Sequence, residues 1–133
     1  MAMGFVPSVL NQGHAQGWEY LPAKAETFGV GEALKWDSGK LTKCSGTTKP
    51  EYISMTAQTV SVAGTEIAVI RVEPDALYDV PAQASVADVA LGSKVTIYTD
   101  GMQITATTSS GVAEIVGKQG TGAAGDIITV KFN

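Results

Sequence analysis

The sequence is poor in the residue types from which catalytic and metal sites are most often built. Its 133 residues include one histidine (His14), one cysteine (Cys44) and one arginine (Arg71). One His and one Cys cannot complete a Cys/His zinc site within a single chain, and a single Cys excludes an intrachain disulfide framework. We therefore expect no metal, no cofactor and no enzymatic activity.

Charge is also scarce, since only 17% of the residues are charged and the formal net charge is -4. Nucleic-acid surfaces depend on clustered Lys and Arg, so we expect no nucleic-acid partner. No apolar run approaches the roughly 20 residues that a membrane-spanning helix needs. Residues 1–15 lack the charged and apolar regions of a secretory signal. These features predict a soluble domain with no membrane partner.

The remaining pattern is strand, turn and strand, with 15 glycines that fall mostly in turns and loops. About eight short strands and almost no helix predict an all-β fold, a small β-barrel or β-sandwich of antiparallel strands. The stretch 66–73 is apolar on both faces, which indicates a central strand covered on both sides. Residues 82–91 form a helical turn at best. The expected strands are 27–36, 40–43, 52–57, 66–73, 77–80, the two arms of a hairpin over 94–107, 112–116 and 126–132.

Two hairpins are expected to turn on Asp and Gly, at 37–39 and at 100–101. Asp100-Gly101 is a strong signal for a type I′ turn, which needs positive φ at both central residues. Pairing outward from this turn places Ile97 opposite Ile104 and sets Thr99 against Met102.

Residues 1–26 differ from the single β-domain predicted for 27–133. Proline and glycine interrupt every period in this segment, yet it carries more aromatic residues than a disordered tail should. We predict an extended N-terminal arm that orders against its own domain, a sister subunit or a partner. The interface residues expected in this arm are Phe5, Val6, Val9, Leu10, Trp18 and Tyr20.

Several apparent chemical motifs have simpler explanations. Residues 120–125 match G-x-G-x-x-G, but a strand follows where a nucleotide site needs a helix. We expect His14 to be a solvated surface residue and Cys44 a strand-end thiol. Asp75 and Asp79 would stand roughly 13 Å apart in a strand, too far for glycosidase chemistry. The acidic stretch that contains them fits no EF-hand calcium site.

The aromatic side chains of the sequence are also compatible with a surface on which sugars stack. Trp36 lies in phase with the core residues of its expected strand, which predicts simple packing. Tyr98 lies on the threonine-rich face of its hairpin and is the better surface candidate.

Three stretches are similar to a known family. Residues 31–54, GEALKWDSGKLTKCSGTTKPEYIS, pair a G-E/D-x-L strand and a short turn with a T-x-x-P loop that leads into a hydrophobic strand. The strand entries LGSKV at 91–95 and GDIITV at 125–130 follow a G-(S/D)-x-V pattern. Over residues 27–132 the chain resembles the small capsid decoration, or cement, proteins of tailed bacteriophages.

This resemblance implies a non-enzymatic virion protein that binds the major capsid protein on the outer surface of the shell. It also implies that the protein clamps neighbouring capsomers, often as a homotrimer, and that it resides in the host cytoplasm during assembly. The family brings no catalytic residues. Two alternatives remain open: a carbohydrate-binding or adhesin-like β-sandwich with exposed rings such as Tyr98 and Tyr78, and a phage tail or baseplate component.

Overall fold

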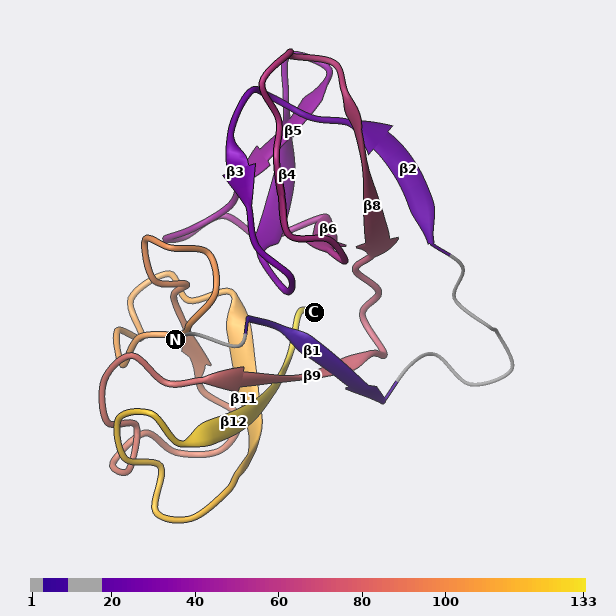
Figure 1. Ribbon diagram of the computed structural model, residues 1–133. Helices are drawn as coiled ribbons and strands as arrows, with labels where there is room; N and C mark the ends of the chain where they lie inside the picture. The colour runs from indigo at the N-terminus through magenta and orange to yellow at the C-terminus, as the bar shows by residue number, and fades with distance from the viewer. Residues whose placement is uncertain (1–3, 10–17) are drawn as a thin grey trace.

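The computed structural model describes residues 4–9 and 18–133, and these residues form strands and no α-helix (Figure 1). The predicted all-β class is therefore confirmed. The twelve strands exceed the roughly eight expected, because residues 1–26 contribute two strands, the stretch 27–36 divides and β7 was not expected. The second arm of the hairpin expected over 94–107 forms isolated bridges at Ile104 and no strand. The strands are β1 (Val6–Val9), β2 (Glu19–Pro22), β3 (Thr27–Phe28), β4 (Ala33–Asp37), β5 (Lys40–Lys43), β6 (Tyr52–Ser54), β7 (Gln58–Thr59), β8 (Glu66–Arg71), β9 (Leu77–Pro81), β10 (Lys94–Val95), β11 (Ala113–Lys118) and β12 (Ile127–Lys131).

These strands form two five-stranded sheets and a two-stranded ribbon. The orders are β1-β9-β12-β11-β10, β2-β8-β6-β4-β5 and β3-β7. Every pair of named strands is antiparallel. None of the sheets closes into a barrel, which is consistent with the β-sandwich rather than the barrel. The second sheet comes nearest to closure at one end, where Ala23 bridges to Leu41.

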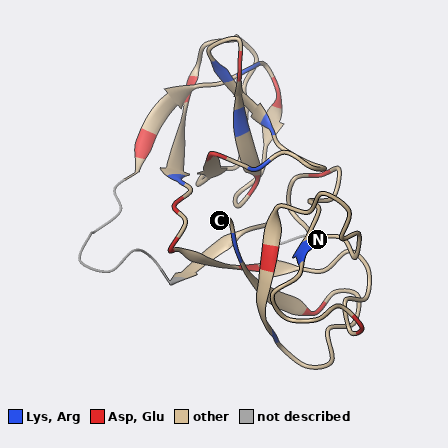
Figure 2. Cartoon of the chain, turned by 180° about the vertical axis from the view of Figure 1, so that it is seen from behind, with Lys and Arg blue, Asp and Glu red and all other residues tan. Residues whose placement is uncertain are grey.

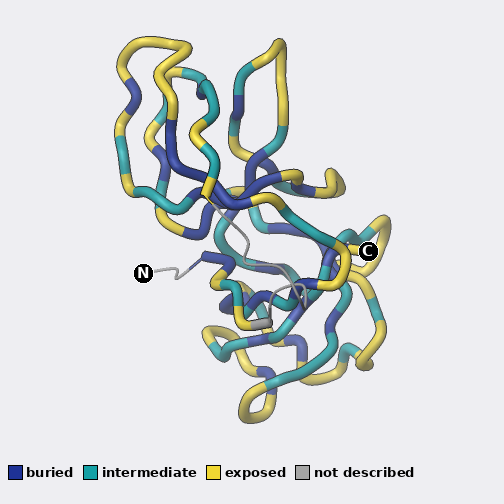
Figure 3. The backbone as a smooth tube through the Cα atoms, turned by 90° about the vertical axis from the view of Figure 1, so that its right-hand side faces the viewer, coloured by how far each residue is buried: buried dark blue, intermediate teal, exposed yellow. Residues whose placement is uncertain are grey.

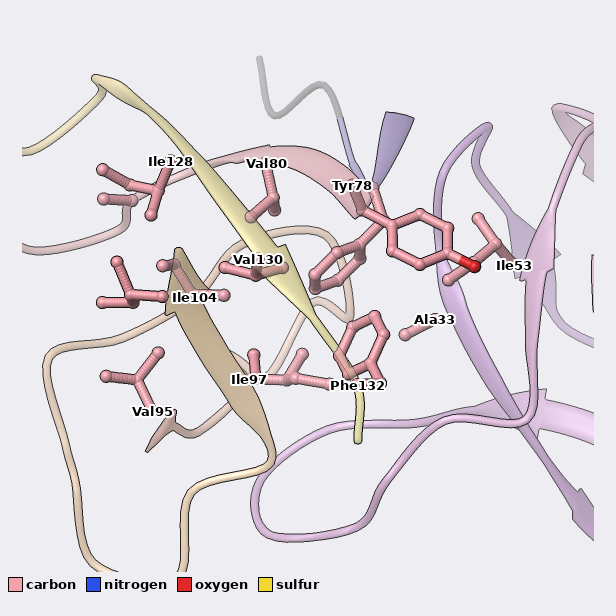
Figure 4. Close-up of a cluster of buried hydrophobic side chains, with 14 of the residues drawn as sticks. Ala33, Ile53, Tyr78, Val80, Val95, Ile97, Ile104, Ile128, Val130 and Phe132 are labelled. Carbon is pink, nitrogen blue, oxygen red and sulfur yellow. The ribbon is translucent and has the colours of Figure 1, made fainter. Parts of the chain in front are cut away.

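The larger hydrophobic cluster lies on the first sheet and extends to the second. Tyr78, Val130 and Phe132 belong to it from the first sheet, and Ala33 and Ile53 join it from β4 and β6 (Figure 4). A smaller cluster fills the space between the second sheet and the β3-β7 ribbon. Buried residues lie along the central strands, and exposed residues lie mainly at the loop tips (Figure 3). The two sheets are thus joined by packing.

Strand β8 shows why the two clusters form on opposite faces of one sheet. Ile67 and Val69 belong to the smaller cluster, and Ile70 belongs to the larger one. Successive side chains of a strand point to opposite faces, so a strand with apolar residues at every position must be covered twice. The prediction of a central strand covered on both sides is confirmed.

The two hairpin turns differ from each other in geometry. Ser38 and Gly39 have φ of 54° and 78°, and Asp37 pairs with Lys40. Both central residues of this two-residue turn therefore have the positive φ that type I′ requires. The expected turn at 37–39 is confirmed, and its central residues are Ser38 and Gly39.

The type I′ turn predicted at Asp100-Gly101 is wrong. Gly101 has a φ of 71°, but Asp100 is not among the residues with positive φ. Asp100 instead accepts a hydrogen bond from the backbone N–H of Met102, at 2.8 Å, and this side-chain turn widens the loop. Thr99 and Met102 thus lie in the loop, whereas the predicted pairing of Ile97 with Ile104 is present.

The single strand expected over 27–36 is also wrong. A turn at residues 29–32, in which Gly31 has a φ of 86°, separates β3 from β4. Phe28 and Leu34 still meet in the smaller cluster, but Val30 lies in the turn and is exposed. The apolar alternation continued across a turn, which is why it resembled one strand.

Residues 82–91 form turns and no helix, as expected. The N–H of Val89 donates to the carbonyl of Val86 at 3.0 Å, and the Ser85 hydroxyl accepts from the N–H of Ala87 at 3.3 Å.

Candidate attachment surface

The described parts of the N-terminal segment fold onto their own domain as two edge strands. β1 pairs with β9, and β2 pairs with β8. Of the three expected ways of ordering this segment, the described residues show the first. The segment is not a separate arm where the structure describes it, because its backbone completes the hydrogen-bonding edge of each sheet.

Phe5 is a core residue, which corrects its assignment to an external interface. Its side chain is fully buried, and its ring lies 5.3 Å from that of Phe132, between centroids. Its N–H donates to the carbonyl of Gly31 at 2.8 Å. A group packed inside its own domain is unavailable to a partner.

The structure describes four of the other five predicted interface residues of the segment. Val6 is 41% exposed on β1, and Val9 ends that strand opposite Leu77. Leu10 lies outside the described residues. Trp18 and Tyr20 are 58% and 63% exposed and stay available for contact.

Strand β2 separates its side chains by face. Leu21 packs against the smaller hydrophobic cluster, and Glu19 forms an ion pair with Arg71 at 3.1 Å. Glu19 and Leu21 alternate along the chain with Tyr20 and with Trp18, which directly precedes the strand. Because residues two apart in a strand share a face, Trp18 and Tyr20 lie on the face opposite to that of Glu19 and Leu21.

The edge of β2 is open to further pairing. β2 ends the order of its sheet, with β8 beside it, and the bridge from Ala23 to Leu41 lies beyond its last residue. An edge strand presents unpaired N–H and C=O groups along its free side. Residues 18–22 therefore combine unpaired backbone groups with two exposed aromatic side chains.

A second surface feature lies beside the Glu19–Arg71 pair. An open hollow of about 340 Å³ is lined by residues 49–52, Arg71 and Val72. Trp36 meets Tyr52 edge to face, with ring centroids 5.6 Å apart, and the Arg71 guanidinium lies 5.9 Å from the centre of the Tyr52 ring. Aromatic faces, one cation and nearby carboxylates are the groups that line many polar small-molecule sites.

The structure distinguishes among the other aromatic candidates. Tyr78 is fully buried, and burial raises its pKa to about 12, so it cannot stack on a sugar. Tyr98 is half-buried. Trp36 was expected to pack in the core, but its side chain is 37% exposed. The sequence missed this because Trp36 lies at the outer end of β4, beyond the part of the strand that the core covers.

The polar candidates offer no catalytic arrangement. Cys44 is buried directly after β5, where it donates to the Thr48 carbonyl, and burial raises the pKa of its thiol to about 11. Such a thiol is protonated at neutral pH and unreactive. His14 lies outside the described residues. Asp79 accepts a hydrogen bond from the Thr129 hydroxyl at 2.8 Å, a contact within the sheet.

The glycine motif at 120–125 is a loop between β11 and β12, as expected. Gly120, Gly122 and Gly125 all have positive φ, and β12 begins two residues after the last of them. The Asp126 carboxylate accepts the N–H of Ala123 at 3.1 Å. No helix opens here, so the geometry that a pyrophosphate requires is missing.

Charge and metal-binding groups are dispersed. Segments that carry Lys and Arg lie interspersed with segments that carry Asp and Glu in the view of Figure 2. Residues 4–9 and 18–133 hold no cluster of three or more His, Cys, Asp and Glu side chains suited to a metal ion. The same residues include no helix with the length and hydropathy to cross a bilayer.

One buried acid was not anticipated from the sequence. Glu32, at the end of the turn before β4, is 3% exposed. Its carboxyl has a pKa raised to about 7, chiefly by burial. An acid beside glycine in a turn is usually solvated, so no pattern in the sequence predicted this.

No known protein family, curated protein or solved structure matches this chain with statistical significance.

Proposed function

We propose that this chain is a structural protein of a tailed-bacteriophage virion that binds the outer surface of the capsid and clamps neighbouring capsomers. The exposure of Trp18 and Tyr20 on the open edge of β2 carries this proposal. The resemblance of residues 27–132 to decoration proteins supports it. The partner is the major capsid protein, and the expected assembly is a homotrimer on the capsid exterior, reached from the host cytoplasm.

The attachment proceeds by strand addition. An extended segment of the capsid protein pairs with the free side of β2, and main-chain hydrogen bonds supply affinity. Trp18 and Tyr20 become covered at the same time, and aromatic rings contribute a large buried area for little conformational entropy. Many copies on a lattice turn a modest affinity at each site into strong avidity.

A capsid-binding assay tests this proposal. The probe is a shell assembled from a tailed-phage major capsid protein encoded in the same genome as this chain, and the readout is co-sedimentation across a concentration series. We expect W18A/Y20A to weaken binding at least tenfold, because both rings lose their contacts. The matched control is L91A, which removes an exposed apolar side chain in the loop between β9 and β10.

The same assay has a clear contrary outcome. Equal binding by W18A/Y20A and wild type would exclude the β2 edge as the attachment surface. Absence of binding by the wild-type chain to its own shell would exclude the decoration role, and binding to tail assemblies instead would assign it to the tail or baseplate. Sedimentation velocity of the free protein tests the trimer separately.

A carbohydrate-binding module is the second candidate, favoured by the hollow beside Tyr52. Trp36, which packs edge to face on the buried Tyr52, offers an exposed ring surface, and Arg71 and Glu51 in the neighbouring hollow offer polar contacts. A glycan array with wild type, W36A and the control W18A tests it. Sugar binding lost in W36A and kept in W18A would support this function, and an array without hits would exclude it.

A further inference from the structure

The carboxyl group of Glu32 lies in a buried site that accommodates a negative charge poorly. Its Oε1 accepts the backbone N–H of Gly29 at 3.3 Å. Its Oε2 is buried and has no hydrogen-bond partner. An ionised carboxylate with one unpartnered oxygen in a buried site is unfavourable unless the site opens to water. The folded arrangement therefore favours the neutral acid.

The backbone around Glu32 connects two other parts of the chain. Gly31 accepts the N–H of Phe5 at 2.8 Å, and the N–H of Ala33 donates to the carbonyl of Gly101 at 2.8 Å. The approach is close on both sides. A Cβ atom at Gly4 would lie 2.7 Å from the Gly31 backbone, and one at Gly101 would lie 3.3 Å from Cγ of Glu32. Movement of residues 29–33 must therefore disturb the docking of the N-terminal segment.

Three charged groups face the Glu32 carboxyl from neighbouring elements. Lys43, at the end of β5, lowers its pKa, whereas Glu26, before β3, and Asp100, in the hairpin loop, raise it. Burial is the largest influence and outweighs the Gly29 N–H and Lys43, which both lower the pKa, so the pKa of Glu32 is about 7. The group consequently changes charge across the physiological pH range.

We propose that Glu32 is a proton-controlled latch: loss of its proton opens residues 29–33 and releases residues 4–9 from their contact with Gly31. The neutral carboxyl tolerates burial against Gly101, so the latch is closed at low pH. The ionised carboxylate gains hydration only when the turn moves outward. The hydrogen bond from Phe5 to Gly31 breaks with that movement. This device does not depend on the proposed capsid role.

Amide hydrogen exchange of Phe5, followed by NMR on the full chain, measures the opening. An open state in which Glu32 regains its ordinary pKa of 4.5 would raise the opening constant up to about 70-fold between pH 5 and pH 8, after correction for intrinsic exchange. The amide of Val69, in the central strand β8, reports global unfolding in the same spectra. We expect the opening free energy at Phe5 to lie below that at Val69 at each pH, because the latch opens without global unfolding.

The variant E32Q separates this latch from other titrations. Glutamine keeps the acceptor for Gly29 and cannot ionise, so the pH response at Phe5 should disappear. The control is E66Q, which neutralises an exposed acid on β8 and should retain the response. An unchanged response in E32Q would overturn the latch. Equal opening free energies at Phe5 and Val69 in the wild type would also overturn it, because Phe5 would then exchange only through global unfolding, and this comparison needs no variant.

Discussion

Phe5 and Phe132 lie at opposite ends of the chain, yet their rings pack 5.3 Å apart, between centroids. Phe132 also contacts Tyr78, at 5.5 Å, so one aromatic group joins the N-terminal segment, β9 and the C-terminal residues. The N–H of Phe5 donates to the carbonyl of Gly31, in the turn between β3 and β4. The N-terminal segment therefore contributes to the core through Phe5 and to the proposed attachment surface through β2.

Removal of the Phe5 ring should destabilise the protein strongly. F5A leaves a cavity beside Phe132 and loses the transfer free energy of the ring, which together lower the free energy of unfolding by about 3–5 kcal/mol. V6A, one residue on and 41% exposed, should change it by about 0.5 kcal/mol or less. Urea unfolding curves give both values. A loss below about 1 kcal/mol in F5A would show that this core contact forms little of the native packing.

The Ser38-Gly39 turn provides a test of backbone conformation without packing effects. No atom lies within 4 Å of the position that a Cβ would take at Gly39, so G39A adds only the strain of positive φ, about 1 kcal/mol. S38N should act in the opposite direction, because asparagine tolerates positive φ better than serine. Thermal unfolding should rank S38N above wild type and G39A below. The reverse order would contradict the turn geometry.

Gly111 is required by close backbone approach rather than by its φ angle. A Cβ there would lie 2.1 Å from the carbonyl oxygen of Lys94, so G111A must displace β10 from β11. We expect a loss of about 2 kcal/mol or more, in the range of severe overpacking. The matched control is G117A on β11, where the nearest atom would be 3.6 Å away. Similar unfolding midpoints for the two variants would argue against this pairing.

Glu32 should make global stability depend on pH. Its folded pKa, about 7, exceeds the ordinary value of 4.5, so its contribution is complete below pH 4.5, declines as pH rises and is lost above pH 7. At about 1.4 kcal/mol per pH unit in that window, the loss comes to about 3–4 kcal/mol at most. The measurement is the difference in unfolding free energy between wild type and E32Q at pH 4, 5.5, 7 and 8.5.

That difference removes the contributions of the other titrating groups, which the two proteins share. We expect E32Q to gain on wild type as pH rises from 4.5 to 7 and the difference to stay constant above this. A difference that is flat from pH 4 to 8.5 would mean that the carboxyl is as well hydrated in the folded chain as in the unfolded one.

Local patterns in the sequence predict much of the strand content. The apolar run at 66–73 predicts the doubly covered β8, because a strand alternates faces whatever its partners are. Ser38 and Gly39 in a short polar gap predict the first hairpin for a similarly local reason. The strand that follows residues 120–125 excludes a nucleotide site, since the required helix would have to begin there.

Long-range packing accounts for what these patterns missed. The burial of Phe5 depends on Phe132, 127 positions away, and no periodicity within residues 1–26 contains that contact. The burial of Glu32 arises because Gly101 and β5 close over the turn, and the exposure of Trp36 arises because the core ends before it. Strand propensity and turn chemistry act between neighbours in sequence, so they specify the β class and its hairpins. Which aromatic rings stay outside, and which acid is drawn in, depends on how the two sheets meet.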